Sequence, residues 1–408
     1  MAAVADTLQD LYLMTDHNTK SAFIPFFTIL STCHKLKTFA YIHDAETPIK
    51  SLNDIQDEIP THELQLTSFN FTSHYLAYEV DAKLPAFLHQ CPHLEQLSLS
   101  CIDGEQILYS IQQNCIKKLQ KLVLHHFLCY QAKHTTANDD SLQLVTASIL
   151  STEECADIMI PYLAKSTDTL KTLYVNLRPV AVPTWDVLLT WNMPNLRHLT
   201  LSFEDLDDNE FIAALIHHLP LLEHVEFEEC EYIDVFVLNA LGQLLHLRSL
   251  SISGVIGAEE DSLADLFLTC AQRGVDGTLK SVTLDNCLDF IDTCDVLQSL
   301  ADVESVQEIR IRECPLISEP TMNLFCDKLQ QHPSIELLEL NRIGAITDQT
   351  LASLSAVEHL TKLELYQLAR ITDEGVSDFR VANSKVELDI QGCGLLLDST
   401  SIPTFHGI

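Results

Sequence analysis

Histidine and cysteine are the residues of this chain whose types and spacing come nearest to a chemical site. They form the run His125-His126-x-x-Cys129-x-x-x-x-His134, and imidazole and thiolate are ligands that zinc prefers. The run overlaps the end of an expected strand and an irregular loop, so we expect a solvated loop there and no metal. The thirteen cysteines include no CxxC pair, and six lie where a repeat, described below, needs a small buried side chain.

The sequence shows no motif of nucleophilic catalysis or of phosphate binding. There is no GxSxG elbow and no glycine-rich phosphate loop, and Gly254-x-x-Gly257 and Gly392-Cys393-Gly394 are isolated pairs typical of turns. Carboxylates are numerous, but pairs of them arise by chance in so acidic a chain, so none is singled out as a general acid or base. We therefore expect no enzyme and no cofactor.

Charge is the most unusual bulk property of the chain. Its 408 residues include 24 Lys and Arg against 58 Asp and Glu, which gives a formal net charge of −34. Nucleic acids and anionic membranes should repel such a chain, because both attract proteins through cations. Basic proteins are its natural electrostatic partners. The strongest acidic stretch, 203–235, has eleven Asp or Glu and no Lys or Arg, and should steer a basic partner.

The sequence also carries expectations about compartment and size. No stretch approaches the ~18 apolar residues of a membrane helix, and residues 1–10 have no basic run ahead of an apolar stretch, as a signal peptide would. An odd number of cysteines without a secretory signal is typical of reduced thiols. We expect a cytoplasmic or nuclear monomer. Length alone would suggest two or three domains.

A pattern of Leu-x-x-Leu-x-Leu, or a close variant of it, recurs along the whole chain. Most copies begin 25 to 29 residues apart, and the weakest copy occupies 61–66. The first positions of the copies are 8, 36, 61, 94, 119, 170, 196, 222, 247, 279, 306, 335, 360 and 385.

One gap in this series is twice as long as the others. The 51 residues between positions 119 and 170 hold either a degenerate copy, at Leu142, Val145 and Ala147, or one unit with a polar insertion around 131–141. The chain therefore has about fourteen or fifteen repeats.

Each repeat combines a short strand with a helix. The alternation Leu-x-Leu is typical of a strand with one buried face, and helical spacing follows it, as in 211–216 after the expected N-cap Asp208. Ser318 with Pro320 marks another helix start. One unit cannot bury its apolar side alone, but stacked units can. We predict an α/β fold, a single horseshoe-shaped solenoid over 1–408 with a parallel inner sheet and outer helices.

In several repeats a cysteine lies three residues after the last apolar residue of the strand, and two other repeats carry Ile-Thr-Asp, at 346–348 and 371–373. In these features the repeat resembles the cysteine-containing class of leucine-rich repeat, of the ribonuclease-inhibitor-like type. The cysteines concerned are Cys230, Cys287, Cys314 and Cys393.

Proteins of that class are most often the substrate-binding part of F-box ubiquitin ligase subunits. The resemblance therefore implies a protein-binding scaffold in ubiquitin-dependent degradation, with a ligase adaptor and a cullin as partners if an F-box is supplied. This sequence departs from the class because its first repeat already starts at Leu8 and no F-box-like segment is recognised. The alternative is an acidic inhibitor or chaperone that masks a basic protein, although the repeats of such inhibitors are longer than most units here.

Side chains between and just after the last two apolar strand residues should point away from the core, onto the inner face of the sheet. In the first two repeats they are apolar, as Tyr12 and Met14 are, which suggests a covered surface. Arg310 and Arg312 form a basic island suited to a carboxylate or a phosphate. We expect a protein partner to bind this face at Glu226, Glu228, Asp285, Arg310, Arg312, Glu339, Asn341, Glu364, Tyr366 and Asp389.

Overall fold

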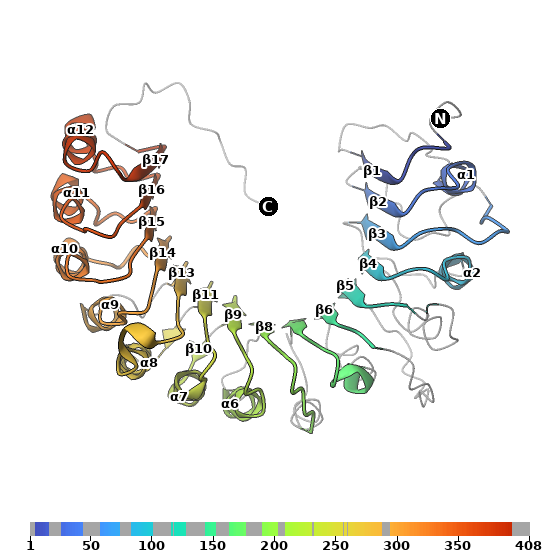
Figure 1. Cartoon of the computed structure of the whole chain (residues 1–408), viewed down its shortest axis with the longest axis horizontal. Coiled ribbons are helices and arrows are strands. Elements are labelled where there is room, and N and C mark those ends of the chain that lie inside the picture. Colours follow the sequence, from blue (N-terminus) through green and yellow to red (C-terminus); the bar gives the residue numbers. More distant parts are fainter. Residues whose placement is uncertain are drawn as a thin grey trace. The chain divides into compact units, whose positions relative to one another are not determined.

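The structure is a computed structural model of the chain (Figure 1). The chain divides into two compact units, unit 1 at residues 1–201 and unit 2 at residues 202–408. No helix in the described part of the chain is both long enough and apolar enough to span a membrane. The described residues are 5–15, 26–43, 58–73, 83–100, 116, 118–127, 143–151, 163–176, 190–202, 209–230, 232–255, 257–258, 260–287 and 294–393.

A parallel sheet holds fifteen strands of the described residues, and its strand order follows the chain. The strands of unit 1 are β1 (Asp10–Thr15), β2 (Thr38–His43), β3 (Ser68–Ser73), β4 (Gln96–Ser100), β5 (Lys121–Phe127), β6 (Thr146–Ser151) and β7 (Thr172–Asn176), and β8 (His198–Ser202) crosses the boundary. Those of unit 2 are β9 (His224–Glu228), β11 (Ser249–Ser253), β13 (Ser281–Asp285), β14 (Glu308–Arg312), β15 (Leu337–Asn341), β16 (Lys362–Tyr366) and β17 (Glu387–Gln391). A separate two-stranded sheet pairs β10 (Tyr232–Ile233) with β12 (Gly257–Ala258).

In each unit the described helices lie on one side of the strands (Figure 1). Unit 1 has α1 (Phe26–Thr32), α2 (Lys83–His89) and a 3-10 turn at Ala164–Ser166. Unit 2 has α6 (Asn209–His217), α7 (Val235–Gln243), α8 (Glu260–Ala271), α9 (Cys294–Ala301), α10 (Glu319–Leu329), α11 (Asp348–Leu354), α12 (Asp373–Ala382) and a 3-10 turn at Gly274–Asp276.

The register of the sheet aligns the repeats residue by residue. Leu250 of β11 lies opposite Val225 of β9 and Val282 of β13, and all three side chains are at most 1% exposed. The apolar repeat positions therefore form the core between strands and helices, and the predicted α/β architecture with a parallel sheet is confirmed. That one continuous solenoid runs through 1–408 stays a prediction.

The weakest predicted repeat is displaced from its expected place. Leu64 and Leu66 were expected to lie in its strand, but β3 begins only at Ser68 and uses Phe69 and Phe71 instead. These two rings lie opposite Phe39 and Tyr41 of β2. The prediction was wrong because Leu64 and Leu66 are also buried, so their alternation imitates that of a strand.

The long gap in the series contains a fifteenth repeat strand, β6. The first apolar residue of this repeat is Leu144, which is fully buried two residues before β6, and Ala147 of β6 lies between Leu122 of β5 and Leu173 of β7. The copy predicted at Leu142, Val145 and Ala147 was thus out of register by two residues. The polar insertion considered at 131–141 lies outside the described residues.

The end of each strand in unit 2 turns through a left-handed residue. Gly254 and Gly392, predicted to lie in turns, adopt φ values of 65° and 64°, and five other residues share this conformation despite carrying side chains. Except at Gly392, which follows the last strand β17, the backbone amide of each donates to the next strand, as Glu229 N donates to Ser253 O at 2.7 Å. The five residues are Glu229, Asn286, Glu313, Arg342 and Gln367.

The residue after this turn is the cysteine position of the repeat. Cys287 Sγ donates to the carbonyl of Ile252 at 3.5 Å and Cys314 Sγ to that of Leu284 at 3.7 Å, each one repeat earlier. The position needs a buried apolar side chain, which Val255, Ile343 and Leu368 provide in other repeats, and a thiol adds a weak donor to this. The expected burial is confirmed for Cys33, Cys91, Cys230, Cys287 and Cys314, whereas Cys393 is partly exposed.

Helix starts connect one repeat with the next. Ser318 is the N-cap of α10, as predicted, and its side chain accepts from Thr321 N at 3.3 Å. Thr372 caps α12 and in turn donates from its backbone N and its hydroxyl to the carboxylate of Asp348, at 2.9 and 2.6 Å. The Ile-Thr-Asp sequence thus places a cap and its supporting carboxylate on successive repeats. The expected N-cap Asp208 lies outside the described residues.

Candidate functional site: the inner face of unit 2

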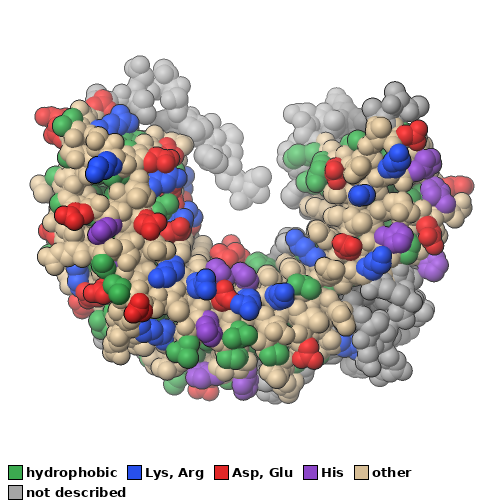
Figure 2. Space-filling model, viewed as in Figure 1, with side chains coloured by type: hydrophobic (Ala, Val, Ile, Leu, Met, Phe, Trp, Pro, Cys, Tyr) green, Lys and Arg blue, Asp and Glu red, His purple; other side chains and the backbone are tan. Residues whose placement is uncertain are grey.

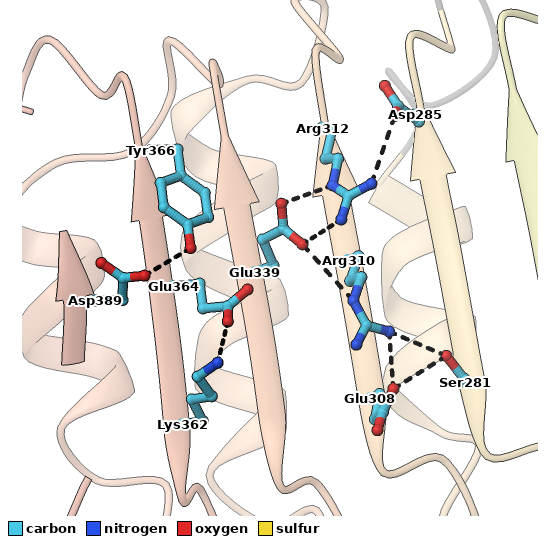
Figure 3. Close-up of polar contacts among 10 residues, drawn as sticks. All are labelled: Ser281, Asp285, Glu308, Arg310, Arg312, Glu339, Lys362, Glu364, Tyr366 and Asp389. Atoms are coloured by element: carbon cyan, nitrogen blue, oxygen red, sulfur yellow. Dashed lines mark hydrogen bonds and ion pairs between the residues drawn. The ribbon is translucent and has the colours of Figure 1, made fainter. Parts of the chain in front are cut away.

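The strands β13, β14 and β16 alternate strictly between partly exposed and buried residues. Their first, third and fifth residues face away from the helices, so each repeat contributes three side chains to the inner face. Ten polar residues of β13–β17 contact one another there, and we refer to them as the charge lattice (Figure 3). The lattice consists of Ser281, Asp285, Glu308, Arg310, Arg312, Glu339, Lys362, Glu364, Tyr366 and Asp389.

Glu339 lies at the centre of the charge lattice and is only 3% exposed. Arg312 donates to it with two nearly parallel hydrogen bonds, from Nε to Oε1 and from Nη2 to Oε2, both 2.6 Å long. Arg310 Nε lies 3.7 Å from the same Oε2, and both guanidinium groups reach Glu339 from the neighbouring strand (Figure 3). A buried carboxylate is stable here because two cations surround it and one of them binds it in bidentate fashion.

Each arginine of β14 also contacts a second acidic side chain. Arg310 Nη1 lies 2.8 Å from Glu308 Oε2, and Arg312 Nη1 lies 3.8 Å from Asp285 Oδ2. The hydrogen bonds from Arg312 to Glu339 raise the pKa of the Arg312 guanidinium. The two cations of the predicted basic island do bind carboxylates, and these belong to the same and adjacent strands. That the island also binds an anion of a partner stays a prediction.

The charge lattice has a net negative charge. Five of its members are carboxylates and three are cations. Burial raises the pKa of Asp285, and the nearby carboxylates of Glu313 and Glu339 raise it further, although Arg312 opposes them. An added cation near Asp285 would stabilise its charged form.

The far side of the charge lattice, on β16 and β17, contains two more polar pairs. Lys362 is hydrogen-bonded to Glu364, and Tyr366 donates its hydroxyl proton to Asp389 Oδ2 at 2.9 Å. Burial together with this bond to Asp389 raises the pKa of Tyr366 to about 12. Tyr366 is therefore a neutral donor at physiological pH.

Asn341 ends β15 beside the charge lattice, in register with Arg312 on one side and Tyr366 on the other. Its buried Oδ1 accepts no hydrogen bond within the described part of the chain. Buried acceptors without partners are uncommon and are costly in free energy. The described residues therefore leave this buried acceptor unsatisfied.

The structure brings together eight of the ten predicted site residues, all on β13–β17. Glu226 and Glu228 are separate from them, because β9 is divided from β13 by β11. They lie opposite Ser251 and Ser253 and are partly exposed. Part of the predicted acidic stretch 203–235, namely 203–208 and residue 231, lies outside the described residues.

Sequence reasoning missed three members of the charge lattice: Ser281, Glu308 and Lys362. Each is the first residue of its strand, directly before a buried apolar residue. The alternation of the strand could have found them, because the residues before and after a buried strand residue lie on the same face of the sheet.

The inner face of unit 1 has a different character. Tyr12 and Met14 of β1 are 71% and 69% exposed, whereas Ala40 of β2 is buried. That a partner or cap covers this apolar surface stays a prediction.

No group of three or more metal-ligating side chains is found among the residues that the structure describes. The candidate run at 125–134 falls only partly within them, since Cys129 and His134 lie outside. The expectation of no metal there stays a prediction.

The geometry of the repeats defines a leucine-rich-repeat solenoid, and comparisons with known proteins agree with this fold. No protein-family model matches the chain, and no curated protein matches it. Among solved structures, it resembles a chain of the yeast Rad7–Elc1 complex, with 15% identity, 80% of each chain covered and a TM-score of 0.50.

A second solved structure, the complex of TLR13 with ssRNA13, has 15% identity and a TM-score of 0.43, with 92% of this chain and 62% of that chain covered. At such identities the likeness concerns the fold alone.

Proposed function

We propose that this chain is a protein-interaction scaffold, and not an enzyme, that binds a protein partner on the inner face of unit 2. The observation that carries the proposal is the charge lattice of β13–β17. It presents a pre-organised polar surface on a rigid sheet, with Glu339 and the arginines fixed by their mutual bonds. Pre-organised side chains lose little entropy when a partner binds. The proposed compartment is the cytoplasm or the nucleus.

The proposed partner presents basic side chains to this surface. Two features favour a cation: the excess of carboxylates in the charge lattice and the raised pKa of Asp285. A lysine or arginine of the partner would donate to these carboxylates. Complementary charge would also speed association.

The finer proposal is that the chain forms the substrate-recognition part of an F-box-type ubiquitin ligase subunit. It rests on the resemblance of the repeats to the cysteine-containing class. Affinity purification of the full-length gene product from cells tests it, with recovery of a ligase adaptor and a cullin as the expected result. A purification that recovers the bound protein but neither of these subunits would contradict it.

The second candidate function is an acidic inhibitor or chaperone of a basic protein, favoured by the net charge of −34. Such masking depends on long-range attraction, so affinity should fall steeply between low and high salt. An affinity that barely changes with salt would argue against this function while leaving the scaffold proposal intact.

A pair of double variants tests whether the inner face of unit 2 is the binding face. Glu364→Lys with Asp389→Lys reverses two charges of the charge lattice, and we expect binding of the purified partner to fall at least about tenfold. The control, Glu358→Lys with Asp378→Lys, makes the same charge change at two exposed positions outside the sheet. Equal loss in both variants would point to net charge rather than to this face.

A further inference from the structure

Unit 1 carries a basic surface at the points where its later strands begin. Lys121 is the first residue of β5 and Lys118 lies three residues before it, while Lys171 directly precedes β7 and Arg197 directly precedes β8. All four residues are exposed. We call these four residues the basic rim, and Figure 2 shows Lys and Arg side chains side by side in this part of the sheet.

The backbone holds the members of the basic rim at fixed spacings. Arg197 N and His198 N both donate to Lys171 O, at 2.9 and 3.0 Å, and Lys171 N donates to Val145 O at 2.9 Å. Neighbouring strands lie about 4.8 Å apart, so the basic side chains start from points separated by one or two strand spacings. The rim from β5 to β8 thus extends over about 15 Å.

The charge of this region contrasts with that of the whole chain. Among the described residues between 116 and 202, the cations are the basic rim and Lys165, and the one carboxylate is the exposed Asp168; the adjoining repeats add Glu95 directly before β4 and Glu223 directly before β9. The structure describes the residues that directly precede β5, β6, β7 and β8. Like charges held this close repel one another, and an anion between them would relieve that repulsion.

From this geometry we propose that the basic rim binds a short, extended segment of acidic protein rich in Asp and Glu. An extended chain advances about 3.3 Å per residue, so about five residues cover the rim. A short acidic segment fits better than a nucleic acid, because a long polyanion would also meet the remainder of a chain that carries −34. The site is separate from the charge lattice of unit 2 and takes a ligand of the opposite charge.

The proposal is tested with the full chain and a fluorescent peptide of alternating Glu, Asp and Gly, followed by fluorescence anisotropy at low salt. We expect saturable binding that weakens about tenfold in the double variant Lys121→Glu with Lys171→Glu, and less in Lys121→Gln with Lys171→Gln. The matched control, Arg380→Glu with Lys385→Glu, makes the same charge change at two exposed residues of unit 2. It should bind within about twofold of the wild type.

Three results would overturn the proposal. These are no binding of the acidic peptide above that of a Ser/Gly peptide, equal loss in the control variant, or tighter binding of a single-stranded RNA of matched charge. Circular dichroism melting of each variant accompanies the titrations. A neutral variant that folds as the wild type does but still binds with full affinity would also contradict the role of these lysines.

Discussion

The first repeats of unit 1 and the last repeats of unit 2 use the same strand positions for different chemistry. In β2 and β3 the buried positions are aromatic, and the rings of Phe39 and Phe69 stack with centroids 6.2 Å apart. In β14 and β15 the equivalent positions are aliphatic, as Ile309 and Leu338 are. Both sets are buried almost completely, so the core tolerates either kind as long as volume and burial are kept.

The inner faces of the two regions differ even more. Tyr12 on β1 is an apolar side chain that is 71% exposed, whereas Glu339 on β15 is a charged one that is 3% exposed. Both occupy the third position of their strand. The repeat therefore decides where a side chain points, and the side chains of neighbouring strands decide whether it is buried. Glu339 is buried on the inner face of unit 2 because the ion pairs of the charge lattice surround it.

The largest effect is expected in the aromatic core of unit 1. Phe69 is 1% exposed and its ring contacts those of Phe39 and Phe87, the latter at 4.8 Å between centroids. Phe69→Ala should lower the free energy of unfolding by about 4 kcal/mol, through lost apolar burial and the cavity left behind. Urea denaturation measures this change.

The inner-face control for that variant is Tyr12→Ala, which should change stability by less than about 0.5 kcal/mol. A loss at Tyr12 as large as that at Phe69 would mean that the exposed apolar side chains of β1 contribute to the core after all.

The centre of the charge lattice should show the next largest effect. Glu339→Ala leaves Arg310 and Arg312 without their shared carboxylate, and because both arginines are partly exposed we expect a loss of about 2 kcal/mol. Glu313→Ala, which breaks the more exposed pair of Glu313 with Arg342, should cost less than about 1 kcal/mol. Chemical denaturation of the two variants distinguishes these values, and equal losses would show that burial of Glu339 is unimportant.

A smaller loss of stability is expected at Gly375, where α12 contacts the preceding repeat. A Cβ at Gly375 would lie 2.1 Å from Asp348 Oδ1, the carboxylate that holds the cap of α12, whereas a Cβ at Gly344 meets nothing within 4 Å. Gly375→Ala should therefore destabilise by about 1.5 kcal/mol, and Gly344→Ala by less than about 0.5 kcal/mol. Thermal unfolding checks both.

In the background of Asp348→Ala, the cost of Gly375→Ala should become smaller but should not vanish, because the Cβ retained at residue 348 would lie 2.8 Å from the new Cβ. An undiminished cost at Gly375 without the carboxylate would contradict this contact.

The smallest effect is a pH dependence that belongs to unit 2. His332 is buried; its Nε2 donates to Val303 O at 3.0 Å, and its Nδ1 accepts from Ile335 N at 3.1 Å. This arrangement needs the neutral ring, and burial lowers the pKa of His332, against the opposing influence of Glu304. Below about pH 6.5 the unfolded chain then binds more protons than the folded one, so stability falls as pH falls.

The measurement is the urea midpoint from about pH 8 to about pH 5.5, and His332→Gln should flatten its decline. The corresponding substitution in unit 1, His62→Gln, replaces an exposed ring and should leave the decline unchanged. An unchanged decline in His332→Gln would assign the pH response to other groups.

The sequence predicted the strand positions well wherever leucine or isoleucine marks them. It failed at β3, because the buried Leu64 and Leu66 just before that strand imitate the alternation of Phe69 and Phe71, and at β6, where the predicted copy lies two residues too early. For the site, eight of the ten predicted residues lie together on β13–β17. Arg310 and Arg312 bind carboxylates, but the sequence did not show which ones, since Glu339 and Asp285 come from neighbouring strands and only Glu308 from the same strand.

By itself, the sequence determined the repeat, and the repeat determines the parallel sheet, the buried apolar positions and the direction of each inner-face side chain. The sequence pattern suffices for this, because strand residues alternate between the two faces and a fixed repeat length brings equivalent residues of successive repeats side by side. The tertiary structure alone decided which charges meet. Glu339 lies opposite Arg310, 29 residues away in the chain, and their interaction depends on a register and a burial that only stacked repeats provide.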